Sequence, residues 1–391
     1  MTSLRLGLNM VGGINWMGGV IYVRTLAMCL ATLPREEQPA VSIVGAVSDI
    51  PEVRDLLAHD FITLGRQGFT ADGTLVGRLA ARIWRIFIRK VRGKGNDPWF
   101  PDVEAIYPVL APAGLDGKEI FWIPDFQYEY LPHLFPAHEL AERRRRAAHI
   151  AAQTGILVLS SLMARDDFHR LYPQARVQTR LLRFCSVLPG LGENAPAKRP
   201  VNLPEKYLYL PNQFWAHKDH ATAFQAIRLL KERGLTVPLV CTGHENDPRK
   251  PDHVPGLKHF VAEHDLPVHF LGLVPRREQV EIFRHAAAVL QPSRFEGWST
   301  VVEDAKAIGR PLILSDFPVH QEQAPEAKFY PQGDAEALAA AIEADWPHLR
   351  PGPDYAAEAA AYACTKERMV EQARTFMSIV ADAVALRREA R

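Results

Sequence analysis

The sequence lacks the features of disulfide-stabilised, membrane-spanning and nucleic-acid-binding proteins. Its 391 residues include only 4 cysteines, which lie far apart without a CxxC pair, as is typical of reduced thiols in the cytosol. No run of about 18 apolar residues is present, so we expect no membrane-spanning helix. The opening stretch, Leu4 to Met10, predicts a short strand rather than a secretory signal. A net charge of +1 argues against nucleic acid as a partner. We therefore expect a cytoplasmic protein.

The composition that is present fits two folded domains. Hydrophobic residues make up 47% of the chain and charged residues 23%, and the length allows each domain its own core. Short strands alternate with helical segments in both halves, which predicts an α/β fold. Residues 190–204 repeat glycine and proline among short polar residues and are the best linker candidate. We predict an N-terminal domain over residues 1–190 and a C-terminal domain over residues 205–370.

Residues 289–316 are the most informative stretch and predict strand, loop, helix, turn and strand in that order. The apolar run at 286–290 has the length of a buried parallel strand. Ser299 or Thr300 is expected to cap the helix, because Thr300 is followed three residues later by a glutamate in the spacing of a capping box. Gly309 is expected to end the helix.

This arrangement has a chemical consequence. The amides from Gly297 to Thr300 lie at a helix N-terminus, where free N–H groups and the helix dipole favour an anion. The same loop carries Glu296, and the first helical turn carries Glu303 and Asp304. A phosphate-binding loop flanked by carboxylates predicts a nucleotide sugar as the ligand. The loop amides would bind its diphosphate, and the carboxylates would accept hydrogen bonds from its hydroxyls. The alternative is an ordinary capped helix with solvated acids.

The stretch resembles the donor-site signature of the retaining GT-B glycosyltransferases of family 4. The matching residues are Glu296, Gly297, Trp298, Gly309, Arg310 and Pro311. The chain departs from the signature at Ser299, which replaces a second glycine, and at the later acid, which is Asp304 in register with Glu303 before it. Either Asp304 holds the ribose and Glu303 caps the helix, or the reverse; the register favours Asp304.

The resemblance implies a fold and a division of labour. In GT-B proteins two doubly wound Rossmann-like domains face each other across a cleft. The N-terminal domain would take the acceptor and the C-terminal domain the nucleotide sugar. The last helix, expected over residues 371–391, would return to the N-terminal domain.

Two places in the first half are candidates for the site. A glycine-bearing loop between the first strand and helix predicts either a plain tight turn or a phosphate approach, and the resemblance implies that Gly18 and Gly19 bring the backbone close to donor or acceptor. Asp125 and Gln127 follow the strand at 120–124, at the edge of the sheet where ligands bind. Asp125 is thus either an acceptor-side catalytic group or a satisfied loop carboxylate. Many family members have a histidine near this point, which this chain lacks.

The second half supplies the expected diphosphate clamp. In the family, the loop after the first strand of this domain carries an arginine and, five residues later, a lysine. Lys218 matches the lysine, whereas Gln213 stands at the arginine position and offers a neutral donor. The nearby His217 and His220 could add positive charge or serve as cap or solvent-facing residues, and no carboxylate cluster suggests a metal. The resemblance places the base near Val274, and the glycine turn at Gly243 completes the donor-site candidates.

Residues 75–94 are different in kind. Arginines recur there every three or four residues among apolar side chains, without an acidic residue. This is a basic amphipathic helix pattern. It predicts an ordinary surface helix docked by its apolar face, a contact with the anionic inner face of a membrane, or an anionic acceptor or partner.

These features predict a retaining transferase that moves a hexose or deoxyhexose from a nucleoside diphosphate sugar. Residues 124–132 resemble a bacterial polysaccharide-assembly subgroup, so the expected acceptor is a glycan or a lipid-linked glycan. Glu296, Lys218 and Asp125 are the expected catalytic residues. Since Lys218 and the helix N-terminus offset the charge of the leaving diphosphate, we expect no metal and no cofactor. The alternatives are an epimerase or hydrolase acting on a nucleotide sugar with the same fold, or a non-catalytic binding module.

Overall fold

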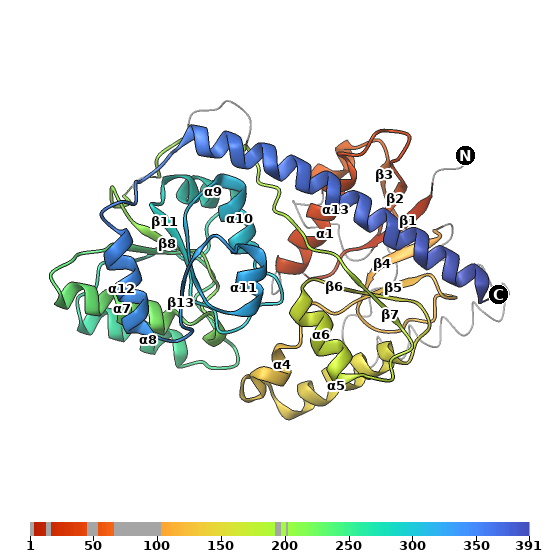
Figure 1. Ribbon diagram of the computed structural model, residues 1–391, viewed down its shortest axis with the longest axis horizontal. Helices are drawn as coiled ribbons and strands as arrows, with labels where there is room; N and C mark the ends of the chain where they lie inside the picture. The colour runs from red at the N-terminus through yellow and green to blue at the C-terminus, as the bar shows by residue number, and fades with distance from the viewer. Residues whose placement is uncertain are drawn as a thin grey trace.

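The computed structural model describes residues 4–12, 17–44, 54–65, 103–191, 197–200 and 202–390. These residues form two parallel α/β halves side by side, joined by the segment after residue 181 and by one long final helix (Figure 1). The basic stretch at residues 75–94 lies outside the described residues.

The first half is built on a seven-stranded parallel sheet with the order β3-β2-β1-β4-β5-β6-β7. Its strands are β1 (Arg5–Asn9), β2 (Ala40–Val44), β3 (Ile62–Leu64), β4 (Ala105–Val109), β5 (Glu119–Trp122), β6 (Ile156–Leu159) and β7 (Gln178–Leu181). Its helices include α1 (Met17–Leu30), α4 (Gln127–Tyr130), α5 (Ala137–Ala151) and α6 (Leu162–Leu171). Strands β4 and β6 are apolar along their length and fully buried, as helices on both faces of a parallel sheet require.

The second half repeats the plan with a six-stranded parallel sheet of order β10-β9-β8-β11-β12-β13. Its strands are β8 (Leu208–Leu210), β9 (Leu239–Cys241), β10 (Val268–Phe270), β11 (Ala288–Gln291), β12 (Leu312–Ser315) and β13 (Lys328–Tyr330). Its helices are α7 (His220–Glu232), α8 (His253–Glu263), α9 (Arg276–His285), α10 (Thr300–Ile308), α11 (Pro318–Gln323) and α12 (Ala335–Asp345), with a short turn of 3-10 helix, η3, at Ala216–Lys218. The strand order reverses between β8 and β11, and ligands of such sheets bind outside the carboxyl ends at that point.

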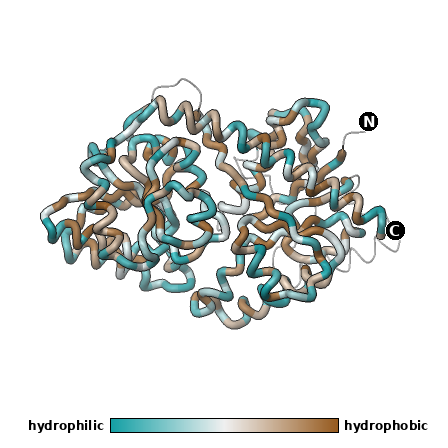
Figure 2. The backbone as a smooth tube through the Cα atoms, in the orientation of Figure 1, coloured by the Kyte–Doolittle hydropathy of each residue, from teal (hydrophilic) through white to brown (hydrophobic). Residues whose placement is uncertain are grey.

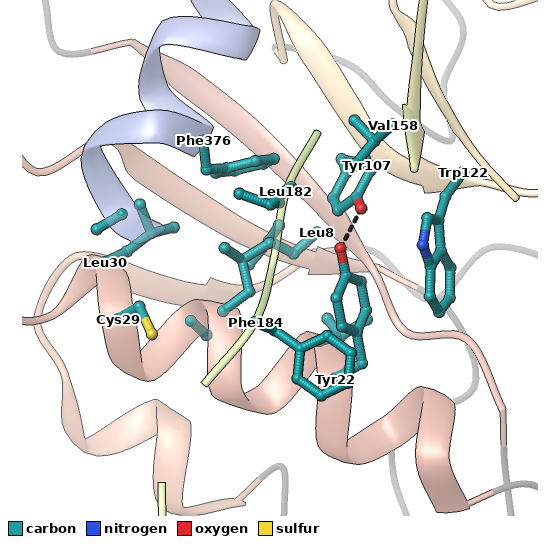
Figure 3. Packing of buried hydrophobic residues seen from close by; sticks show 14 of the residues in the cluster. Leu8, Tyr22, Cys29, Leu30, Tyr107, Trp122, Val158, Leu182, Phe184 and Phe376 are labelled. Atoms are coloured by element: carbon teal, nitrogen blue, oxygen red, sulfur yellow. Dashed lines mark hydrogen bonds between the residues drawn. The ribbon is translucent and has the colours of Figure 1, made fainter. Parts of the chain in front are cut away.

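Helix α13 (Tyr355–Glu389) runs along both halves (Figure 1). The Asp354 carboxylate begins it by accepting the Ala357 N–H at 3.0 Å. Near the start of the helix, Glu358 pairs with Arg284 of α9, and further along Phe376 enters the core of the first half. Figure 3 shows Phe376 close to Tyr107 of β4, with the hydrogen bond between the hydroxyls of Tyr107 and Tyr22 beneath them.

The colouring by hydropathy follows this architecture. Hydrophobic stretches gather along the sheets, whereas hydrophilic stretches are concentrated on outer helices and loops (Figure 2). Among the residues that the structure describes, no helix combines the length and the apolar character needed to cross a bilayer.

Candidate active site

The candidate site lies where loops after β8 and β11 meet the N-terminus of α10. Ser299 caps α10 by accepting the Val302 N–H at 3.4 Å, and Gly309 ends the helix with a φ of 71°. A Cβ at Gly309 would lie 2.8 Å from the Ala357 carbonyl oxygen, so the turn needs glycine for both its conformation and its space. The predicted strand, capped helix and glycine stop are therefore present.

The predicted capping box is wrong. The carboxylate of Glu303 turns away from the cap, accepts the Gln323 side-chain amide at 3.1 Å and pairs with Arg368 of α13. Glu303 is fully buried, and a buried carboxylate without hydrogen-bond donors is strongly unfavourable. The contacts with Gln323 and Arg368 therefore prevail over a contact with the helix terminus. Its role in the structure is to tie α10 to α11 and α13.

Lys218 and Glu296 form an ion pair at the centre of the site. The Lys218 Nζ lies 2.6 Å from the Glu296 Oε1. Lys218 ends η3, and the left-handed Asp219 that follows it (φ 54°) is fixed by Arg294 at 2.9 Å. Burial alone would raise the pKa of Glu296, but the Lys218 ammonium and the other polar groups around the carboxylate together outweigh burial and hold that pKa below its ordinary value. The carboxylate is thus ionised and held next to the cation.

A buried amide network supports Glu296, and sequence reasoning missed it. Gln291 Nε2 donates to Glu296 Oε1 at 2.7 Å and lies 3.1 Å from the hydroxyls of both Ser293 and Ser299. Asn212 Nδ2 in turn donates to Gln291 Oε1 at 2.5 Å. The available signal was the position of these two amides, which follow adjacent parallel strands at the point where the strand order reverses.

The loop after β5 brings Asp125 against the donor loop. A Cβ at Gly297 would lie 2.5 Å from the Pro124 carbonyl oxygen and 2.8 Å from the Asp125 Cβ. Asp125 Oδ1 accepts the Gln127 N–H at 2.9 Å. Loss of hydration raises the pKa of Asp125, and the Glu296 carboxylate adds to that shift while Lys218 opposes it. The structure therefore places three predicted residues, Asp125, Lys218 and Glu296, within electrostatic reach of one another.

Trp298 is used as an anchor between the halves. Its Nε1 donates to the Phe184 carbonyl at 2.9 Å, and its ring packs with the apolar cluster of the first sheet. Two residues further along the same connecting segment, the Ser186 hydroxyl hydrogen-bonds Asp304. Arg276 of α9 also holds Asp304 through two hydrogen bonds of 2.6 and 2.7 Å. The side chains of Trp298 and Asp304 thus face the connection between the domains.

The amides at the start of α10 differ from the prediction in one respect. The Ser299 N–H donates to the Gln323 Oε1 at 2.8 Å, so this amide is already occupied. The next amide, that of Thr300, has no acceptor within the described part of the chain. Of the amides predicted from Gly297 to Thr300, that of Ser299 is therefore not available to an anion, whereas that of Thr300 is.

The other predicted residues are spread around this centre. Gly243 lies between loops, where a Cβ would come within 2.2 Å of the Asn212 carbonyl oxygen, and its N–H donates to Gly272 at 2.9 Å. Gln213 is half-buried beside it. Gly18 and Gly19 lie in the first turn of α1, the former exposed and the latter buried.

A hollow lies next to Val274, the residue near which the base is predicted to bind. It is lined by His244, Glu245, Lys258, Phe270, Leu271, Gly272 and Leu273. The Lys258 ammonium lies 5.3 Å above the Phe270 ring and pairs with Glu245. The hollow is lined by both apolar and polar side chains.

Of the alternatives left open for His217 and His220, the structure excludes a positive charge and a solvent-facing role. His220 stacks on Phe214 with ring centroids 4.1 Å apart, and burial lowers its pKa to about 3. Burial also holds the pKa of His217 well below its ordinary value. Both are neutral and neither faces solvent, so they add no positive charge to Lys218. In the described ranges, no three histidine, cysteine or acidic side chains gather closely enough to hold a metal ion.

Comparison with known proteins identifies the fold and the second half of the chain. Residues 193–345 match the family model described as "Glycosyl transferases group 1". No curated protein matches the sequence significantly.

Solved structures match over nearly the whole length. Sucrose-phosphate synthase from Thermosynechococcus elongatus has a TM-score of 0.61 at 19% identity over 99% of both chains. HepE of Anabaena, solved with UDP and glucose, has a TM-score of 0.63 at 14% identity over 97% of this chain and 100% of its own. WaaG, a glycosyltransferase involved in lipopolysaccharide biosynthesis, has a TM-score of 0.56 at 14% identity over 97% of this chain and 98% of its own.

These matches confirm the predicted fold of two facing Rossmann-like halves. The protein is a glycosyltransferase of the GT-B fold whose second half carries a Glycosyl transferases group 1 domain.

Proposed function

We propose that this protein transfers a hexose or deoxyhexose from a nucleoside diphosphate sugar to a glycan or lipid-linked acceptor, with retention at the anomeric carbon. The observation that carries the proposal is the ion pair of Lys218 and Glu296 beside the start of α10. Lys218 can bind a diphosphate, and Glu296 can accept hydrogen bonds from sugar hydroxyls. A phosphorylated sugar needs both at once.

The chemistry follows from where charge develops. As the glycosidic bond breaks, the diphosphate becomes more negative and the sugar approaches an oxocarbenium ion. Lys218 and the amide of Thr300 lie ready for the leaving group, in a setting that needs no reorganisation at the moment of reaction. Asp125 reaches the same region from the acceptor side. We assign no covalent nucleophile and propose reaction on one face, with the leaving phosphate assisting.

We assign the ribose to Asp304 rather than Glu303. Asp304 faces α9, which begins directly after the loop of Val274 and the base hollow. Glu303 faces α13 and α11 instead. In this proposal Arg276 fixes the Asp304 carboxylate for the ribose hydroxyls. HepE was solved with UDP and glucose, so uridine donors come first in the screen.

The test begins with a thermal-shift screen of UDP-, GDP-, ADP- and TDP-sugars, since a ligand that prefers the folded state raises the unfolding temperature. Turnover of the best donor is then measured as nucleoside diphosphate release for Lys218→Ala and Glu296→Ala. We expect each variant to lose at least about 100-fold in kcat. Lys231→Ala and Glu232→Ala, exposed residues of α7, are the matched controls.

Normal turnover in both site variants would refute the proposal. Rapid donor breakdown without any acceptor would favour the hydrolase alternative. Interconversion of donor sugars would favour the epimerase, and donor binding without turnover against any acceptor would favour a binding module.

A further inference from the structure

The side-chain amide of Gln291 forms a buried hydrogen-bond network beside the site. It is the last residue of β11 and has no solvent exposure. Its Nε2 faces three oxygens, those of Glu296, Ser293 and Ser299, while its Oε1 faces the Asn212 amide. An amide turned the other way would point its oxygen at the Glu296 carboxylate. The network therefore fixes which end of Gln291 meets Glu296.

Two groups donate hydrogen bonds to the same oxygen of Glu296, and only one of them is also expected to bind the diphosphate. Lys218 Nζ at 2.6 Å is charged and is the expected partner of the diphosphate, whereas Gln291 Nε2 at 2.7 Å is neutral and has no such second partner. Because Gln213 stands where the family has an arginine, Lys218 is the only cation of the predicted clamp. A diphosphate must compete with Glu296 for it.

Drawing Lys218 towards the diphosphate would leave a buried carboxylate short of one donor. Glu296 is only 8% exposed, so water does not replace that donor easily. The other titratable groups that face Glu296 are His320 of α11, which burial keeps neutral, and Asp125, which has its own negative charge. Neither takes over the place of Lys218. Gln291 remains as the fixed donor.

We propose that Gln291, oriented by Asn212, is a positioning residue that holds the Glu296 carboxylate on the donor sugar while Lys218 turns to the diphosphate. This inference rests on the proposed function, since it assigns Glu296 to the sugar. It adds that a neutral amide pair at the ends of β8 and β11 lets one lysine serve two anions in turn.

The test exchanges the amide for groups of nearly the same shape. Gln291→Glu keeps the volume, and its introduced carboxyl can donate to Glu296 only when protonated. Gln291→Met keeps the length and donates at no pH. If Gln291 only filled space, the kcat of Gln291→Glu would not follow the protonation of the introduced carboxyl, although the stability of the variant would still depend on pH.

The first measurement needs no ligand. In Gln291→Glu, burial and the neighbouring Glu296 raise the pKa of the introduced carboxyl in the folded state above its unfolded value. The stability of the variant is therefore fully present at low pH and lost as the pH rises. We expect its unfolding temperature to match that of wild type near pH 5 and to fall behind towards pH 8.5. The deficit of Gln291→Met should stay constant over that range.

The second measurement is turnover with the best donor of the panel of UDP-, GDP-, ADP- and TDP-sugars. We expect kcat of Gln291→Glu to fall about 10- to 100-fold at pH 8 and to recover towards pH 5.5, and kcat of Gln291→Met to fall at every pH. Binding of the free nucleoside diphosphate should change less than about threefold, since it carries no sugar for Glu296 to hold. A merely structural role would not divide kcat from affinity in this way.

The inference is overturned if the unfolding temperature of Gln291→Glu shows no dependence on pH relative to Gln291→Met, or if kcat is insensitive to both changes. Glu296→Gln separates this failure from that of the proposed function. If Glu296→Gln loses turnover while the Gln291 variants keep it, only the positioning role fails. If Glu296→Gln keeps turnover, the assignment of Glu296 fails first.

Discussion

A single methyl group at Gly297 should separate the donor loop from the acceptor-side loop. In Gly297→Ala the new Cβ would lie 2.5 Å from the Pro124 carbonyl oxygen, whereas ordinary contacts begin at 3.4 Å, so the loops must part by about 0.9 Å. The obstacle is backbone, which does not rotate away. Misplacement of catalytic groups by about 1 Å costs on the order of 100-fold in rate, and overpacking costs about 1–3 kcal/mol of stability.

Gly256→Ala is the matched control. Nothing lies within 4 Å of a Cβ at Gly256, which is near the start of α8, so alanine there should leave turnover unchanged and stabilise the helix slightly. For both variants, turnover is measured as nucleoside diphosphate release and stability by thermal unfolding. If Gly297→Ala retains wild-type kcat, the close contact between the two loops has no part in catalysis and the geometric argument is refuted.

Further predictions concern the charges and the domain contacts. Lys218→Met should destabilise the protein at pH 7 by leaving the Glu296 carboxylate without its cation. Because the pKa of Glu296 is depressed in the folded state, denaturant titrations should show this loss shrinking as the pH falls and Glu296 becomes protonated. Trp298→Phe keeps an aromatic ring but leaves a buried carbonyl without its donor, so denaturant unfolding should show a loss of about 1–2 kcal/mol. Arg276→Met should lower the free energy of unfolding by about 3 kcal/mol, because it leaves the buried Asp304 carboxylate without its cation. Part of that loss should be recovered in denaturant unfolding of the double variant with Asp304→Leu. Replacing the arginines of residues 75–94 with glutamine should abolish co-sedimentation with anionic liposomes, if this stretch contacts a membrane; unchanged binding would exclude that role.

The sequence predicted those parts of the site that depend on the local chain. The capped helix at Thr300, its glycine stop and the strands on either side follow from short patterns of polarity and turn residues. The pairing of Lys218 with Glu296 did not follow from spacing, because 78 residues separate them. Their common assignment to the donor site came from the family resemblance, and the parallel sheet explains how the ends of β8 and β11 bring them together.

What the sequence did not predict depends on competition between distant partners. The sequence predicts a free helix-terminal amide at Ser299. Only the packing of α11 shows that this amide already donates to the Gln323 side chain. The same packing, together with Arg368, draws Glu303 away from its expected cap. Gln291 looked like the unremarkable end of a buried strand. Its importance comes from Asn212, which lies far away in the sequence.

The long helix α13 has a consequence for how the protein is made. Met369, Phe376 and Val380 belong to the hydrophobic cluster of the first sheet, although they follow the whole second half in the sequence. The half that is translated first is therefore completed last. During synthesis the apolar face of the first half must stay uncovered until α13 has emerged, and removal of α13 should destabilise the first half.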